Sequence, residues 1–118
     1  FTVLVRNATF RVVRALARRA FEDATDLVEA AEGAEPWTAD RFATLLEPYF
    51  QEHGAIRIDP RARATEYCVI TEEDDAWRVR QVLLDPDAHG EWYLGFVVDL
   101  EAADEADRPV LVLETLAC

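Results

Sequence analysis

The segment 85–90 holds the side chains that are best suited to bind a metal ion or to transfer a proton. Asp85, Asp87 and His89 alternate there, with Pro86 between the two carboxylates. This spacing matches no established metal-binding motif, whereas Asp, Pro and Gly are residues that tight turns prefer. We therefore interpret the segment as a polar turn, and the sequence predicts neither a metal site nor a cofactor.

Two acidic runs, residues 72–75 and 101–107, have the charge of calcium-binding loops without their pattern. Neither run shows the alternation of Asp or Asn followed by Gly that supplies the ligands and the bend of such a loop. Both runs are therefore predicted to be solvated loops.

The chain also lacks the patterns of nucleophilic and nucleotide-binding sites. It contains no Ser, no Gly-x-x-x-x-Gly-Lys loop and no Gly-x-Gly-x-x-Gly segment. His53 follows Glu52 at the expected end of a helix, where the helix dipole favours a positive charge. Cys68 and Cys118 have no motif spacing and are predicted to be free thiols, as in a reducing cytoplasm. We expect no catalytic residue in this segment.

The turn at 85–90 lies between two stretches with the alternation of β-strands. Apolar and polar residues alternate over residues 77–84 and again over residues 92–100. This predicts an antiparallel hairpin, and Gly95 in its second strand suits a bend in the sheet. Because a single hairpin is only marginally stable, further strands or a helical layer must cover its apolar face. The same alternation predicts these strands at residues 56–58, 67–72 and 110–116.

Helical periodicity occupies the first half of the chain. Apolar residues recur at steps of three and four over residues 10–31, which predicts one amphipathic helix that ends near Gly33. A second helix is expected to follow Thr38, a good N-cap residue, and to end at Gly54. Pro48 lacks a backbone N–H and is expected to kink that second helix.

Helices followed by a meander of strands are typical of an α+β domain. The sequence predicts one domain over residues 1–118, with two to three N-terminal helices packed on a curved antiparallel sheet of four to five strands. This arrangement resembles the cone-shaped fold of nuclear-transport-factor-like and ketosteroid-isomerase-like proteins. That fold often encloses a pocket, and the residues best placed to line one are Tyr67, Trp77, Trp92 and Asp99. A buried aromatic core accounts for the same residues, and we favour that interpretation.

The charge of the chain is unevenly distributed. The net charge is −12, yet residues 1–20 carry five Arg and no acid, so the remaining residues carry −17, the difference between −12 and +5. A body this acidic repels phosphate, and direct binding of nucleic acid by this domain is therefore not expected. The basic first helix is instead a candidate docking face, and its residues are Arg6, Arg11, Arg14 and Arg18. A solvated helix face is the alternative interpretation.

The first residues and the apolar runs bear on the context of the chain. It begins with Phe1 and contains no Met, and five Arg stand where a helix N-terminus favours acids. Both features predict that Phe1 is a cut end and that more of the protein lies upstream of it. No apolar run is long enough for a membrane span and no signal peptide is present, so we expect a cytoplasmic protein without membrane contact.

Four separated stretches stand out together, namely RNATFR at 6–11, LEPYFQEH at 46–53, WRVRQVLLDP at 77–86 and VDLEAADEA at 98–106. In the same order, they resemble the final segment of a family of actinobacterial DEAD/DEAH-box helicases, which implies that this chain is the C-terminal piece of a longer protein. In that family a domain of unknown function follows two RecA-like motor lobes. Glu47 replaces an Asp of the family pattern, and the HGEW segment at 89–92 only approximates the family's DHDW.

The resemblance implies a non-catalytic accessory domain, because the ATP-binding and helicase motifs of the family lie outside these residues. Its partners would be the motor lobes or another protein. Two alternatives remain open from the sequence. One is a free-standing cone-fold protein that binds or isomerises a small apolar ligand, and the other is a homodimerisation module. An open interior with an ionisable group would support the ligand-binding alternative, whereas a filled interior would support the other two.

Overall fold

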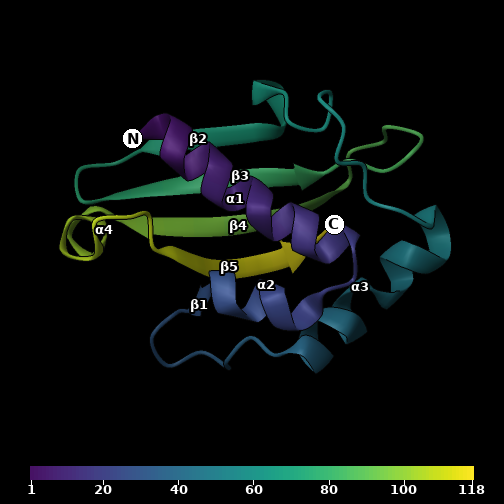
Figure 1. Cartoon of the computed structure of the whole chain (residues 1–118), viewed down its shortest axis with the longest axis horizontal. Coiled ribbons are helices and arrows are strands. Elements are labelled where there is room, and N and C mark those ends of the chain that lie inside the picture. Colours follow the sequence, from purple (N-terminus) through teal and green to yellow (C-terminus); the bar gives the residue numbers. More distant parts are fainter.

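The structure, a computed structural model, describes all 118 residues and contains four α-helices, one short 3-10 helix and a five-stranded sheet. The helices are α1 (Thr2–Ala17), α2 (Phe21–Leu27), α3 (Ala39–His53) and α4 (Leu100–Ala106), and the 3-10 helix η1 is Thr65–Tyr67. The strands are β1 (Glu29–Ala30), β2 (Cys68–Glu72), β3 (Ala76–Leu83), β4 (Trp92–Asp99) and β5 (Leu111–Ala117). In Figure 1, α1 crosses the sheet diagonally and α3 lies beside the end of the sheet where β5 terminates. The predicted α+β class, with N-terminal helices packed on a sheet, is confirmed.

The sheet has the spatial order β1-β5-β4-β3-β2. Strands β2 to β5 form an antiparallel meander, and its centre is the predicted hairpin of β3 and β4, paired from Ala76↔Asp99 to Leu83↔Trp92. The two-residue β1 joins the far edge and runs parallel to β5. The sheet is therefore mixed, whereas the sequence predicted a wholly antiparallel sheet. The one parallel pair arises because β1, which directly follows α2, runs in the same direction as β5.

Alternate residues of the strands face a single apolar core. The inward-facing residues of the two central strands include Val79, Leu83, Leu94 and Phe96, all buried. Most residues with the opposite orientation are exposed or half-buried, as Arg80 shows, and Val82 near the end of β3 is a buried exception. The sheet therefore has one face covered by helices and one face open to solvent, as antiparallel sheets commonly do.

Gly95 lies where β4 and β5 fall out of register. Gly95 pairs with Thr115, while the next residue, Phe96, pairs with Leu113, so one residue of β5 is bulged. A Cβ on Gly95 would lie 3.2 Å from the Thr115 Cβ, which is too close for comfortable packing. The sequence indicated a bend at this glycine, and a bulge with close approach of two strands is found there.

The single helix predicted for residues 10–31 is wrong, because two helices occupy this region. Helix α1 ends in a Schellman motif, in which Arg19 adopts a left-handed conformation (φ 57°). The N–H of Arg19 donates to the Leu16 carbonyl at 3.0 Å, and the N–H of Ala20 donates to the Ala15 carbonyl at 2.9 Å. Glycine usually occupies the left-handed position of this motif, so the arginine concealed the end of the helix.

Two other segments also differ from the sequence prediction. The acidic run at 101–107, expected to be a loop, forms most of α4, which Asp99 caps by accepting a hydrogen bond from the N–H of Ala102 at 3.1 Å. The strand expected at 56–58 does not form, and Arg57 donates one backbone hydrogen bond to the Leu84 carbonyl at 2.8 Å. The two errors have different origins, because a local cap at Asp99 starts α4, whereas the segment 56–58 bonds to a residue that is distant in the sequence.

Helix α3 begins and ends as its sequence predicts. Thr38 accepts a hydrogen bond from the N–H of Arg41 at 3.1 Å, and Gly54 ends the helix with a φ of 80°. Trp37 stacks on Phe42, with ring centroids 4.9 Å apart, and its indole N–H donates to a carbonyl of β5 at 2.8 Å. Pro48 lies inside the helix. These contacts fix α3 against the end of the sheet.

The interior is filled by large side chains from α1, α3 and the sheet. Among the largest with full burial are Phe42 and Tyr49 of α3, Leu16 of α1 and Phe96 of β4. No buried side-chain nitrogen or oxygen lacks a hydrogen-bond partner. None of the helices has both the length and the apolar character that crossing a bilayer requires.

Candidate functional site

Exposed large apolar side chains are concentrated at the first turn of α1. Five large apolar side chains are exposed, and three of them are Phe1, Val3 and Leu4, with exposed fractions of 48%, 68% and 54%. Phe1 also packs edge-on against Trp77, with ring centroids 5.2 Å apart. Scattered apolar residues are ordinary on a protein surface, but three within four residues form a patch that suits contact with another molecule.

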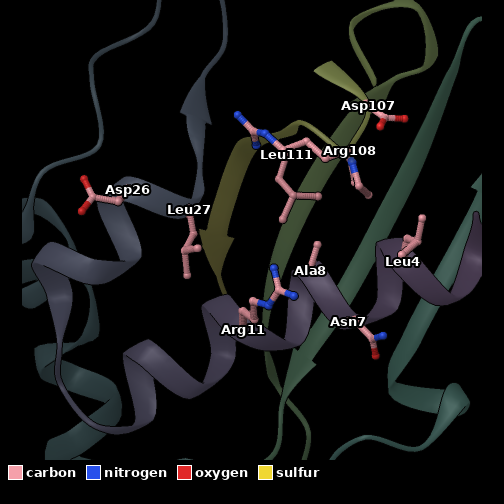
Figure 2. A pocket seen from close by; sticks show the side chains of 10 residues that line it. Leu4, Asn7, Ala8, Arg11, Asp26, Leu27, Asp107, Arg108 and Leu111 are labelled. Atoms are coloured by element: carbon pink, nitrogen blue, oxygen red, sulfur yellow. The ribbon is translucent and has the colours of Figure 1, made fainter. Parts of the chain in front are cut away.

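A groove of about 250 Å³ borders this patch. Figure 2 shows Leu4, Ala8 and Arg11 of α1 along one wall and Leu27 and Leu111 along the other. The remaining lining residues include Asn7 and four from the ends of neighbouring elements, namely Asp26, Asp107, Arg108 and Pro109. The groove therefore has apolar residues on both walls and charged residues of both signs around it.

A smaller hollow of about 140 Å³ lies on the other side of α1. Val3 and Asn7 contribute to it from the helix, and Arg63 contributes from the loop before η1. Arg63 donates a hydrogen bond to the Asn7 side chain at 2.9 Å, and its guanidinium lies 4.8 Å from the centre of the Phe10 ring. The exposed residues of α1 thus form a ridge with a hollow on each side. We call this ridge, which borders the groove of Figure 2, the α1 face. Its residues are Phe1, Val3, Leu4, Asn7 and Arg11.

The four arginines predicted as a docking face divide into two groups. Arg11, Arg14 and Arg18 are exposed, and their spacing places them on one side of α1. Arg6 is half-buried, and its guanidinium donates to the Cys68 carbonyl at 2.7 Å. None of the four lies within ion-pair distance of a carboxylate. Three of them are therefore available to a partner, whereas Arg6 fastens α1 to the edge strand β2.

A buried polar cluster beneath α1 adds further contacts between this helix and strands β2 and β3. The hydroxyl of Thr9 lies 3.3 Å from the Gln81 amide oxygen and 3.8 Å from the Cys68 sulfur. The amide nitrogen of Gln81 donates to two backbone carbonyls, at 3.1 and 3.3 Å. Burial raises the pKa of the Cys68 thiol and outweighs the opposing hydrogen bond from Thr9 and the charge of Arg6. Cys68 is thus a structural residue.

Thiol labelling of the folded protein is expected to modify Cys118 rapidly and Cys68 slowly. Both are free thiols, as predicted, but Cys118 is exposed whereas Cys68 is buried with a raised pKa, and the thiolate is the reactive form. Reaction with an aromatic disulfide reagent at pH 8 should therefore release about one equivalent quickly. The Cys118→Ser variant should lose this fast phase, and a fast phase that survives in it would show that α1 does not protect Cys68.

The four residues predicted to line a pocket do not meet. Trp77 and Asp99 lie at one end of the β3–β4 hairpin, and Trp92 lies at the other end, where its ring packs edge-on against Tyr49 at 5.6 Å. Tyr67 belongs to η1, and its carbonyl accepts a hydrogen bond from Gln81. Asp99 is the N-cap of α4 and faces solvent. The three aromatic residues are half-buried and pack against the core.

A second group of polar side chains gathers at the opposite end of α1. Asp85 and His89 lie in the loop after β3, and the end of α3 brings His53 beside them. The His53 Nδ1 and the His89 Nδ1 each lie 3.7 Å from the Asp85 Oδ2. The sequence analysis considered Asp87 together with Asp85 and His89. Asp87 lies in the same loop, but its side chain is exposed and is not part of the cluster.

The predicted turn is confirmed by the N–H of Ala88, which donates to the Asp85 carbonyl at 2.9 Å, and further hydrogen bonds hold the Asp85 side chain in place. The N–H groups of Gly90 and His89 donate to its carboxylate at 2.9 and 3.1 Å. Burial alone would raise the pKa of Asp85, but these hydrogen bonds and the nearby His53 together lower the pKa below its ordinary value. Burial raises the pKa of the neighbouring Tyr49 phenol, and the charge of Asp85 raises it further.

Sequence reasoning missed that His53 belongs with Asp85. The contact joins residues that are far apart in the chain, and only the packing of α3 on the loop after β3 creates it. The sequence held one weak signal for this pairing. The chain has only two histidines, His53 after Glu52 and His89 after the turn residues 85–88. That signal was too weak to pair them without the fold.

The comparisons with known proteins identify the family but no activity. A search of curated proteins and a search of solved structures each returned no match to this chain. The likeness to the cone-shaped fold therefore stays a prediction. A family described as a domain of unknown function (DUF3516) matches residues 1–116. Because the match spans almost the whole chain, the protein belongs to the DUF3516 family.

Proposed function

We propose that this chain is a non-catalytic interaction domain that docks on another protein through the α1 face. The observation that supports the proposal is the concentration of exposed apolar side chains on the first turn of α1, beside the groove of Figure 2. Apolar patches bordered by polar groups are characteristic of sites where proteins bind one another. The exposed Arg11 on the same face suits such a contact, because arginine is enriched in protein interfaces.

The charge distribution favours a protein partner over a nucleic acid. Arg11, Arg14 and Arg18 extend the α1 face as a stripe of positive charges without carboxylate partners. Residues 21–118 carry a net charge of −17, so a long phosphate backbone would meet repulsion over most of the surface. The expected partner surface combines apolar residues with a few carboxylates that face this stripe.

The resemblance to the C-terminal segment of DEAD/DEAH-box helicases suggests the motor lobes of such a helicase as that partner. In this proposal the domain contributes docking or regulation, and the motor lobes contribute ATP hydrolysis. The filled core supports an interaction role over binding of a small apolar ligand, since large side chains such as Phe42 and Phe96 occupy the interior.

Replacing Val3 by Glu is expected to weaken binding to the motor lobes at least about tenfold. Val3 is the most exposed apolar residue of the α1 face, and a carboxylate there would be buried without a partner. Folding should be unaffected, because an acid in the first turn of a helix is favourable. Isothermal titration calorimetry of the chain against separately purified motor lobes measures the effect.

Ile58→Glu is the matched control for this measurement. Ile58 is 46% exposed and lies outside the groove and the smaller hollow, so its replacement should leave the affinity within about twofold. An equal loss of affinity for the motor lobes in Val3→Glu and Ile58→Glu would contradict docking through the α1 face. Tight binding of single-stranded RNA by the wild-type chain at physiological salt would contradict the protein-docking role itself.

Homodimerisation through the open face of the sheet is a second candidate function. Val69 is 50% exposed on the edge strand β2, and the half-buried Tyr93, Val97 and Val112 add apolar surface on the outward side. Arg78 also lies on this face, where it pairs with Glu73 at 2.8 Å and Glu114 at 3.4 Å. Sedimentation equilibrium separates the two candidates, since a dimer that Val69→Glu dissociates and Val3→Glu preserves would favour the sheet face.

A further inference from the structure

The only two histidines of the chain face the same carboxylate. His53 at the end of α3 and His89 in the loop after β3 each place Nδ1 3.7 Å from the Asp85 Oδ2. One ligand atom from each of the three residues lies within 4.8 Å of the others. From this geometry we propose that His53, Asp85 and His89 bind a divalent zinc-type cation.

The distances suit ligands around an ion better than direct hydrogen bonds. A separation of 3.7 Å is too long for a hydrogen bond between an imidazole and a carboxylate. Two ligand atoms that are each about 2.1 Å from an ion and 3.7 Å apart subtend an angle of about 120° there, close to the tetrahedral arrangement that zinc prefers. The widest separation must contract by roughly 1 Å for all three atoms to reach such an ion.

Two of the three ligands are already fixed and the third can adjust. The side chains of Asp85 and His53 are 2% and 4% exposed, and backbone N–H groups hold the Asp85 carboxylate on both oxygens. The His89 side chain is 55% exposed, so its ring can turn toward the ion without disturbing the core. This combination of a rigid buried pair with one mobile ligand leaves an entry path from solvent.

Two nearby glutamates complete the arrangement. The Glu52 Oε1 lies 3.8 Å from the His53 Nε2, on the ring nitrogen that does not face Asp85. A carboxylate that accepts a hydrogen bond from the second ring nitrogen orients a metal-bound imidazole and strengthens it as a ligand, and the Glu52 carboxylate must move roughly 1 Å closer to do so. The Glu91 Oε1 lies 3.8 Å from the His89 Nδ1 and can supply a fourth ligand. Two imidazoles with carboxylate oxygens suit zinc, whereas calcium and magnesium favour oxygen ligands alone.

A charge-neutralising contact between protonated imidazoles and Asp85 is the competing explanation for the cluster. It predicts the same residues and distances but no affinity for metal. Titration with Zn²⁺ at pH 7.5 separates the two, and the protein should carry no histidine tag. The exposed Cys118 is replaced by Ser in every sample, so that its thiol cannot bind the ion.

We expect one zinc ion to bind per chain with micromolar affinity or tighter, measured by calorimetry. Because the chain has two histidines, its nitrogen-15 spectrum contains two imidazole spin systems, and both should shift together at one equivalent of Zn²⁺. His89→Gln should weaken binding at least about tenfold, as even the loss of a supporting residue does at metal sites. Magnesium at the same concentration should shift neither imidazole.

Asp87→Asn is the control, because it removes a carboxylate from the same loop without touching the cluster. It should leave the zinc affinity within about twofold. Circular dichroism checks that His89→Gln is folded, which the exposure of this side chain leads us to expect. The proposal is overturned if only one imidazole shifts, if His89→Gln binds zinc as the wild type does, or if no binding occurs at 100-micromolar concentrations of the metal, about the weakest affinity we would accept for this site.

Discussion

Replacing Phe42 by Ala is expected to lower the free energy of unfolding by about 4 kcal/mol. The Phe42 ring is completely buried and stacks on Trp37, whose indole N–H is bound to β5. Its removal leaves a cavity where α3 meets the sheet, and the surrounding core can collapse only in part. Urea unfolding followed by circular dichroism measures the difference, which is a large share of the total stability of a domain this size.

Phe50→Ala is the comparison within the same helix. Phe50 is only half-buried, so its replacement should cost roughly 1–2 kcal/mol, less than the loss at Phe42. If Phe42→Ala lowered the free energy of unfolding by less than Phe50→Ala does, α3 would not pack on the sheet through the Phe42 ring.

Asp85→Ala is expected to lower the free energy of unfolding by about 3 kcal/mol at pH 7 in the presence of a chelator. Two backbone N–H groups, from His89 and Gly90, lose their acceptor, and His53 loses its neighbouring carboxylate. Asp85→Asn retains one acceptor oxygen and should cost less. The same urea unfolding experiment measures both variants.

The cost of Asp85→Asn should depend on pH in a defined direction. The pKa of Asp85 is lowered in the folded protein, so the ionised carboxylate stabilises the fold above the unfolded pKa of about 3.9. That contribution is lost as the pH falls through the lower folded pKa. The difference between wild type and Asp85→Asn should therefore shrink on acidification to pH 3 and below. A difference that stays constant would contradict stabilisation by the charge of Asp85.

The elements that the sequence predicted correctly were those with a signal in neighbouring residues. The period-two pattern placed β2 to β5, and Thr38 and Gly54 placed the ends of α3, because each signal is read from neighbouring residues. The parallel pairing of β1 with β5 joins Glu29 to Val112, and two residues of β-strand leave no periodicity to detect. The helix end at Arg19 was hidden for a different reason, since the usual glycine is absent.

The candidate sites were predictable to a smaller extent. The arginines of the first helix stood out by composition, and three of them are exposed, but the sequence did not distinguish Arg6, whose guanidinium is tied to a carbonyl of β2. Asp99 was a candidate to line the pocket of a cone-shaped fold, whereas its carboxylate caps the next helix. The apolar ridge at Phe1, Val3 and Leu4 and the approach of His53 to Asp85 depend on which faces the fold leaves open or brings together.

Site-specific photo-crosslinking tests the docking proposal most directly. A benzophenone amino acid is placed at Leu4 on the α1 face, or at Ile58 as the control, in the longer helicase chain to which the proposal assigns this domain, and the crosslinked peptides are mapped by mass spectrometry. We predict that position 4 crosslinks to a motor lobe and that position 58 does not. Crosslinks from position 4 to RNA alone, or equal crosslinking from both positions, would contradict docking through the α1 face.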